Sequence, residues 1–185
     1  MFVLGGRAKS ANIELHDVRW VVGYKIEETY DALRKDWFGT CEGLHIDRYK
    51  KLKYLDDYSL SLKNIEKKKP KNNKLLNGNS YTNENLWFVY IGGYDPGSMQ
   101  EKHAFGLCVA SSKLEAINSA KFKWLIGCKK KHKDDITSLK IITGCDDCQL
   151  INKVGNWEIV LNLENNFIEE NNNPDWYGYK RIDKI

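Results

Sequence analysis

The chain has 185 residues, which is enough for one large domain or two small ones. Hydrophobic residues make up 42% of it and aromatic residues 12%, so the composition supports a packed core and excludes a wholly disordered chain. The net charge of +4 is mild, and much of the lysine lies between residues 63 and 74, so the charge is poor evidence for nucleic-acid binding. No apolar run suits a membrane helix and the N-terminus lacks a signal-peptide pattern, so we expect a cytoplasmic protein without membrane attachment.

The first half of the chain predicts the element order β-β-α-β-β. Residues 1–4 are apolar and stop at Gly5-Gly6, which we read as a short strand that ends in a bulge or turn. Ile26, Tyr30, Leu33 and Trp37 are spaced as one apolar stripe of a helix over residues 26–38. Alternating or β-branched residues predict further strands at residues 14–22, 44–47 and 58–62, with Asp56-Asp57 as the turn before the last of these.

The second half of the chain predicts a similar series of elements. Residues 86–91 are typical of a strand, and residues 101–109 alternate as a second one. Ser112 and Glu115 form a capping-box pattern, which predicts a helix from this point to about Trp124. We expect another strand near residues 131–134 and a last one at residues 157–161.

A pattern of polar residues occurs twice at a constant distance of 87 residues, the distance from His16 to His103. All four histidines of the chain fall into matching pairs. The repeated positions are Glu14 and Glu101, His16 and His103, His45 and His132, and Asp47 and Asp134. We therefore predict an internal duplication.

The predicted fold class is α+β, with two duplicated β-β-α-β-β modules in a pseudo-twofold arrangement and antiparallel or mixed sheets, each covered by one helix. The expected division is a first module at residues 1–63, a Lys- and Asn-rich linker at 64–85, a second module at 86–155, and a C-terminal strand and tail at 156–185. Few aromatic residues are interleaved with the linker lysines, so we favour a mobile, solvated linker over a nucleic-acid arm.

Several short stretches resemble a known family. They are residues 2–7, 12–18 and 43–47 in the first half, and residues 91–95, 101–103 and 132–135 in the second. These stretches resemble the bacterial domain of unknown function 1543 family, whose members carry one or two copies of the domain. The resemblance covers most of the chain except the linker and the last residues. It implies a bacterial or phage-like cytoplasmic protein with two tandem copies, and it implies no activity.

The repeated residues are candidates for catalysis or metal binding. A strand places residues two apart on the same face, so Glu-x-His and His-x-Asp each present a carboxylate beside an imidazole. Such pairs serve in general acid–base catalysis, for which the candidates are Glu14, His16, Glu101 and His103. The same residue types bind divalent metals, and the candidate ligands are His16, His45, Asp47, His103, His132 and Asp134. The possible cofactor is thus a divalent metal ion.

The sequence leaves three interpretations of these residues open. They could form an enzyme site that acts on a small molecule, with or without a metal. They could instead belong to a non-enzymatic ligand-binding or protein-interaction module, with the Lys-rich segment as a docking element. A duplicated structural device, in which each core histidine is satisfied by its neighbouring glutamate, would show the same pattern. The enzyme is the preferred interpretation, and the sequence indicates neither a substrate nor an oligomeric state.

Two other motifs predict structure and not function. Cys145 and Cys148 form a lone C-x-x-C, whereas a zinc site requires two further ligands at a defined spacing, so the five cysteines are expected to be free thiols. The pairs Gly5-Gly6 and Gly92-Gly93 are not followed by the helix start that a phosphate-binding loop requires. We expect turns or bulges at both pairs.

Overall fold

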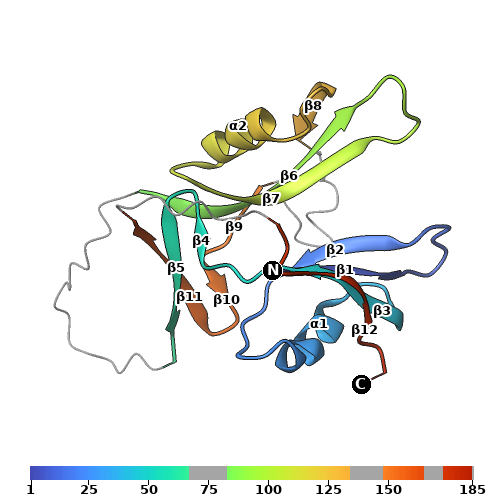
Figure 1. Ribbon diagram of the computed structural model, residues 1–185, viewed down its shortest axis with the longest axis horizontal. Coiled ribbons are helices and arrows are strands. Elements are labelled where there is room, and N and C mark those ends of the chain that lie inside the picture. Colours follow the sequence, from blue (N-terminus) through green and yellow to red (C-terminus); the bar gives the residue numbers. More distant parts are fainter. Residues whose placement is uncertain (67–82, 134–147, 165–172, 185) are drawn as a thin grey trace. The chain divides into compact units, whose positions relative to one another are not determined.

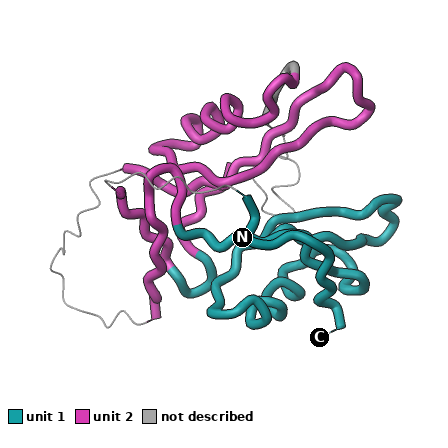
Figure 2. The backbone as a smooth tube through the Cα atoms, viewed as in Figure 1, with its two compact units in different colours: residues 1–53, 154–157, 169–185 teal, residues 54–153, 158–168 magenta. Residues whose placement is uncertain are grey.

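The computed structural model describes residues 1–66, 83–133, 148–164 and 173–184, with residues 129–133 described by their backbone. The chain forms two compact units (Figure 2). The first unit comprises residues 1–53, 154–157 and 169–185, and the second comprises residues 54–153 and 158–168. No helix in the described ranges is both long and apolar enough to cross a membrane.

The first unit contains a four-stranded sheet in the order β12-β3-β1-β2 (Figure 1). Its strands are β1 (Phe2–Arg7), β2 (Leu15–Arg19), β3 (Thr40–Tyr49) and β12 (Trp176–Arg181). All of its neighbouring strands are antiparallel. The strand β12 comes from the C-terminal tail, so the tail is an integral part of this sheet.

A short helical segment covers one face of this sheet. It consists of the 3₁₀ helix η1 (Glu27–Thr29) and the α-helix α1 (Tyr30–Asp36). The predicted stripe is confirmed, because Tyr30, Leu33 and Trp37 are buried and Ile26 packs against them. The sheet contributes the other core side chains, which are Phe2, Leu4, Leu44 and Ile46, and Ile182 joins them from the chain after β12.

The second unit has a sheet built on β6 (Asn85–Tyr94). Its order is β7-β6-β8, with β7 at Lys102–Ala110 and β8 at Lys129–Lys133, and β9 (Cys148–Leu150) also pairs with β6. The helix α2 (Lys113–Lys123) packs on it through Ala116, Ile117 and Ala120. Its predicted start is confirmed: Ser112 Oγ accepts a hydrogen bond from the Glu115 N–H at 3.3 Å, while the Glu115 carboxylate accepts one from the Ser111 N–H.

A third sheet has the order β10-β11-β5-β4. Its strands are β4 (Tyr54–Leu55), β5 (Tyr58–Asn64), β10 (Lys153–Val154) and β11 (Trp157–Leu163). The turn predicted at Asp56-Asp57 joins β4 to β5, and both aspartates have positive φ angles of 46° and 67°. Two positive φ angles are typical of the two-residue turns whose twist matches a hairpin.

The architecture is mostly antiparallel sheet with two short α-helices among the described residues. The structure does not confirm the finer prediction of two equal β-β-α-β-β modules with a helix on every sheet. The strand predicted at residues 58–62 lies in the third sheet as β5, whereas β9, at the corresponding place in the second half, pairs with β6. Most of the Lys- and Asn-rich segment (residues 67–82) and the Asp146-Asp147 pair lie outside the described residues.

The glycine pairs do not end their strands, contrary to the prediction. Gly5-Gly6 lies within β1 and Gly92-Gly93 lies within β6. The predicted irregularity is present, because the register shifts after Gly5 and after Gly92. Close packing explains Gly6: a Cβ atom there would lie 2.8 Å from the indole ring of Trp37.

Candidate histidine–carboxylate site

The sheet of the first unit brings two of the predicted motifs together. Gly5 in β1 lies opposite His16 in β2 on one side and opposite His45 in β3 on the other. Leu44 and Ile46 face the core beneath α1, so the alternation of β3 directs His45 and Asp47 to the opposite face. Glu14, His16, His45 and Asp47 gather there, and we call these four residues the histidine–carboxylate cluster.

Asp47 lies between the two histidines of the cluster. Its Oδ1 atom is 3.2 Å from His45 Nε2 and its Oδ2 atom is 3.2 Å from His16 Nε2. Glu14 Oε1 is 3.0 Å from the same His45 Nε2 atom. The Oδ2 atom of Asp47 is buried and makes no hydrogen bond of good geometry. Its contact with His16 is therefore an ion-pair distance and not a hydrogen bond. Two carboxylates thus converge on one imidazole nitrogen.

The cluster runs from the interior of the unit to its surface. The side chain of His45 is 2% exposed, that of Asp47 is 23% exposed, and those of Glu14 and His16 are 44% and 55% exposed. The ring of Tyr179 in β12 helps to cover His45, because the two ring centroids are 4.0 Å apart. His45, and not His16, is therefore the buried histidine of the set.

A backbone carbonyl fixes the orientation of His45. Its Nδ1 atom lies 2.8 Å from the Gly43 carbonyl oxygen, which can only accept a hydrogen bond. We therefore assign the Nδ1 proton from this contact, which leaves Nε2 as the atom that faces Glu14 and Asp47. A hydrogen bond at one ring nitrogen of a histidine selects the tautomer and so determines the role of the other nitrogen.

The C-terminal segment holds the Gly43 backbone in place. Asp183 Oδ2 accepts a hydrogen bond from the Gly43 N–H at 2.9 Å, and Gly43 has a left-handed φ angle of +80° that favours glycine. Hydrogen bonds from Arg181 and from the Gly43 N–H hold the pKa of Asp183 well below its usual range. Asp183 is thus anionic at neutral pH and anchors the residue whose carbonyl orients His45.

The contacts of His45 require a proton or another cation among Nε2, Glu14 and Asp47. A bare Nε2 lone pair would face two carboxylate oxygens at 3.0 and 3.2 Å, and three such acceptors repel one another. A proton on Nε2 or on one of the carboxyl groups converts this repulsion into a charge-assisted hydrogen bond. The arrangement can therefore store a proton between His45, Glu14 and Asp47.

The tight packing of the cluster explains the glycine at position 5. A Cβ atom on Gly5 would lie 2.4 Å from His45 Nε2 and 2.9 Å from Asp47 Oδ2. Real Cβ atoms do not approach other heavy atoms this closely, so a larger residue would displace the imidazole or the carboxylate. The function of Gly5 is to leave space for His45.

The second unit repeats part of this arrangement. Gly92 in β6 lies opposite both His103 and His132, as Gly5 lies opposite His16 and His45. Glu101 Oε2 is 3.9 Å from His103 Nε2, and the His103 ring stacks on Tyr90 with a centroid distance of 5.2 Å. His132 is placed by its backbone in β8, and Asp134 lies outside the described residues.

The geometry gives the predicted metal site no support. Within residues 1–66, 83–133, 148–164 and 173–184, no group of three or more His, Cys, Asp or Glu side chains is arranged to hold a metal ion. Cys148 is buried and its thiol donates a hydrogen bond to the Lys113 carbonyl at 3.9 Å, and Cys145 of the C-x-x-C motif lies outside these ranges.

Sequence reasoning missed the residues that support His45. Gly43 belongs to the stretch 43–47 that resembles the family but was not a candidate site residue. Tyr179 and Asp183 belong to no motif and lie more than 130 positions from His45 in the sequence. The one available signal was Gly43, a glycine two residues before a histidine in a predicted strand. The prediction of a bulge at Gly5 described the backbone and did not identify its contact with His45.

Comparison with known proteins identifies the family of the chain. A family model described as Domain of Unknown Function (DUF1543) matches residues 11–62 and 98–160. The chain belongs to this family. The two matched segments, which are consistent with two copies of the DUF1543 domain, contain Glu14, His16, His45 and Asp47 and their four counterparts. The strands β1 and β12 lie outside the DUF1543 segments.

A solved structure resembles almost the whole DUF1543 chain. It is the crystal structure of a protein Il1583 from Idiomarina loihiensis, which is 30% identical in sequence. The similarity covers 98% of this chain and 94% of that chain, with a TM-score of 0.65. No curated protein matches the chain.

Proposed function

We propose that the histidine–carboxylate cluster of the first unit is a general acid–base site that exchanges protons with a small-molecule substrate. The observation that carries this proposal is the contact between His45 Nδ1 and the Gly43 carbonyl, because it commits Nε2 to Glu14 and Asp47. A proton held among these three groups is positioned for transfer, which typically accelerates a reaction by about 10²- to 10⁴-fold.

The burial gradient suggests a division of roles. Glu14 and His16 are the exposed members, so they are the groups that a substrate would contact. Asp47 would link His16 to the buried His45, which supplies or takes up the proton. His45, Asp47 and Asp183 are then positioning residues, and Glu14 and His16 are the catalytic ones.

We also infer that the two halves derive from one duplicated module. The support is the common register, in which a glycine of the central strand faces two histidines in both units. Glu101, His103, His132 and Asp134 would then form the corresponding set in the second unit. The proposal is placed on the first unit, because the side chains of all four cluster residues are described there and Asp47 lies between the two histidines, whereas Asp134 and the side chain of His132 lie outside the described residues.

A divalent metal ion is the competing proposal for the cluster, although the described side chains form no metal-binding group of three or more ligands. A histidine that donates its Nδ1 proton to a carbonyl while Nε2 faces carboxylates is also typical of metal-bound histidines. Elemental analysis of untagged protein distinguishes the two occupants. A stoichiometric divalent metal that is lost together with His45 would replace the proton-transfer proposal with a metal site.

The proposal predicts that the protein catalyses proton exchange with solvent. Wild-type protein would be incubated in D₂O with a small-molecule extract of cells, and deuterium incorporation would be followed by mass spectrometry. We expect incorporation into a particular compound, and its loss in Glu14→Gln and His16→Asn, whereas Lys9→Gln, an exposed residue outside the cluster, should behave as wild type. Incorporation that persists in both cluster variants would contradict the proposal.

A further inference from the structure

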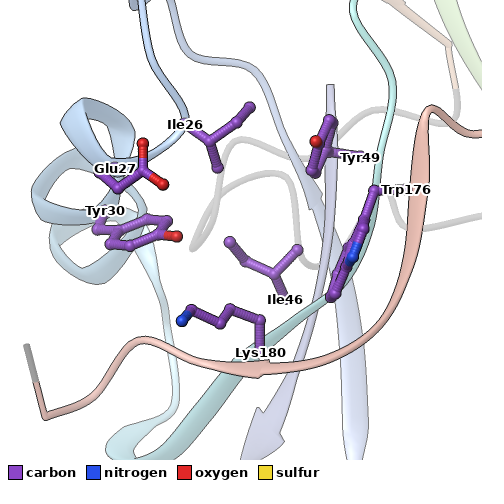
Figure 3. Close-up of a pocket in the computed structure, with 7 residues that line it drawn as sticks. All are labelled: Ile26, Glu27, Tyr30, Ile46, Tyr49, Trp176 and Lys180. Atoms are coloured by element: carbon purple, nitrogen blue, oxygen red, sulfur yellow. The ribbon is translucent and has the colours of Figure 1, made fainter.

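A pocket lies on the other face of the same sheet, between α1 and the strands β3 and β12 (Figure 3). We call it the α1 pocket. Its volume is about 190 Å³, below the roughly 300–1,000 Å³ of pockets for drug-sized ligands. This size suits a molecule with a single ring.

Aromatic and aliphatic side chains form the wall and the floor of the α1 pocket. Trp176 and Tyr49 are paired residues on β12 and β3, and their rings are stacked with centroids 5.9 Å apart and planes 13° apart. Ile26 and Ile46 also line the pocket. Aromatic rings favour offset-stacked or edge-to-face neighbours, so this wall can receive another ring.

A polar group of a largely buried side chain lines the α1 pocket. Tyr30 is 5% exposed, and its hydroxyl, which forms no hydrogen bond with any described residue, is accessible from the pocket. The hydroxyl points away from α1 toward Ile46 (Figure 3). Burial, and then the nearby Glu27 and Tyr49, raise the pKa of Tyr30, so the group stays a neutral O–H donor.

Two opposite charges also line the α1 pocket. Glu27 on η1 and Lys180 on β12 are both exposed lining residues, and neither forms an ion pair within the described part of the chain. A ligand with a single negative charge would be attracted by Lys180 and repelled by Glu27, and the reverse would hold for a cation. A ligand with both charges complements both residues.

We propose that the α1 pocket binds a small aromatic zwitterion, of the class of the single-ring aromatic amino acids. The ring would lie against Tyr49 and Trp176, the carboxylate would accept hydrogen bonds from the Lys180 ammonium and the Tyr30 hydroxyl, and the ammonium would face Glu27. The pocket shares its strands with the histidine–carboxylate cluster, but the two sites lie on opposite faces of the sheet and the proposal does not depend on catalysis there.

The test is direct binding of L-phenylalanine to the full chain, measured by calorimetry and by the change in tryptophan fluorescence that a ring beside Trp176 would cause. Phenylacetate and phenethylamine carry one charge each and serve as probes of the two charged residues. We expect saturable binding of L-phenylalanine, and binding of each single-charge analogue that is at least about tenfold weaker.

Variants assign the contacts. Tyr30→Phe, which keeps the ring and removes the hydroxyl, should weaken L-phenylalanine binding about five- to tenfold, the loss of one hydrogen bond. Lys180→Met should weaken the binding of L-phenylalanine and phenylacetate, and should leave the binding of phenethylamine unchanged or make it tighter. Glu27→Gln should weaken the binding of L-phenylalanine and phenethylamine, and should leave the binding of phenylacetate unchanged or make it tighter. The matched controls, Tyr177→Phe on β12 and Glu28→Gln on η1, change residues that do not line the pocket and should bind as wild type.

Three results would overturn the proposal. The first is the absence of saturable L-phenylalanine binding to wild-type protein up to about 10 mM, because a weaker Kd would not indicate a specific site. The second is binding of either single-charge analogue as tightly as the zwitterion. The third is undiminished binding in both Lys180→Met and Glu27→Gln, which are surface changes that leave the fold intact. None of these results bears on deuterium exchange at the cluster.

Discussion

Gly5 and His45 face each other across β1 and β3 so closely that a Cβ atom on Gly5 would lie 2.4 Å from His45 Nε2. The same nitrogen is the atom that meets Glu14 and Asp47. The space for the imidazole is therefore created by the absence of a side chain on the neighbouring strand. Any residue larger than glycine at position 5 must move the group on which the cluster depends.

Gly5→Ala should destabilise the protein by about 1–3 kcal/mol, the usual cost of forcing one extra group into a packed site. Gly97→Ala is a suitable control, because its Cβ atom would meet only Asp95 Oδ1, at an ordinary 3.5 Å. The control should lie within about 0.5 kcal/mol of wild type in urea-induced unfolding. Equal stability of Gly5→Ala and wild type would show that His45 does not occupy the described position.

The two histidines of the cluster should differ in their effect on stability. His45→Ala leaves the Gly43 carbonyl without its donor and leaves Glu14 and Asp47 without the imidazole between them, so we expect a loss of about 2–4 kcal/mol. His16→Ala removes an exposed group and should cost less than about 1 kcal/mol. Similar losses for both variants, in matched denaturant titrations, would contradict the burial described here.

Asp183 should make the protein sensitive to acid. Its pKa is lower in the folded protein than the ordinary value of 3.8, so its stabilisation is complete above that value and is lost as the pH falls toward the lower folded one. Asp183→Asn should be less stable than wild type at neutral pH and should lose less stability on acidification below about pH 4. The exposed Asp36→Asn is the control and should retain the acid sensitivity of wild type.

Two cysteines should differ strongly in reactivity. Cys41 is exposed, whereas burial raises the pKa of Cys108 to about 11 and leaves little of the reactive thiolate at neutral pH. A thiol reagent such as Ellman's reagent should modify Cys41 rapidly in the folded protein and Cys108 only after unfolding. Mass spectrometry of the partly modified protein would locate the label, and early modification of Cys108 would indicate that the core under α2 opens readily.

Local patterns predicted the helices well. The stripe of Ile26, Tyr30, Leu33 and Trp37 and the start at Ser112 depend on neighbours within one or two turns, so the sequence contains most of the information. The strand face was predictable in the same sense, because alternation places His45 with Asp47. Alternation does not show how deeply a face is covered. For this reason the sequence favoured His16 as the central histidine, whereas His45 is the buried one.

Long-range packing was not predictable from the repeat. Trp37 and Trp124 are 87 residues apart in matching positions, yet Trp37 lies over Gly6 in β1 and Trp124 lies over Gly106 in β7. Gly93, which corresponds to Gly6, is approached instead by Leu125 and Cys128. The constant spacing preserves the register of the glycine and the histidines. It does not preserve the strand on which each tryptophan packs, which is β1 for Trp37 and β7 for Trp124.

The support of the site by the C-terminal segment could not be predicted either. Tyr179 reaches His45 and Asp183 reaches Gly43 because β12 pairs with β3 across more than 120 positions of sequence. The tail has no counterpart in the first half that would have suggested this pairing. Strand pairing between distant segments depends on the whole fold and not on a local pattern.

The most direct test of the proposed proton store is the protonation state of the His45 ring, observed by ¹⁵N NMR of ring-labelled protein. The account predicts that Nδ1 carries a proton in the folded protein, and that Glu14→Gln changes the signal of Nε2 and not that of Nδ1. The opposite tautomer, with a proton on Nε2 and none on Nδ1, would show that Gly43 does not orient His45 and would contradict the account.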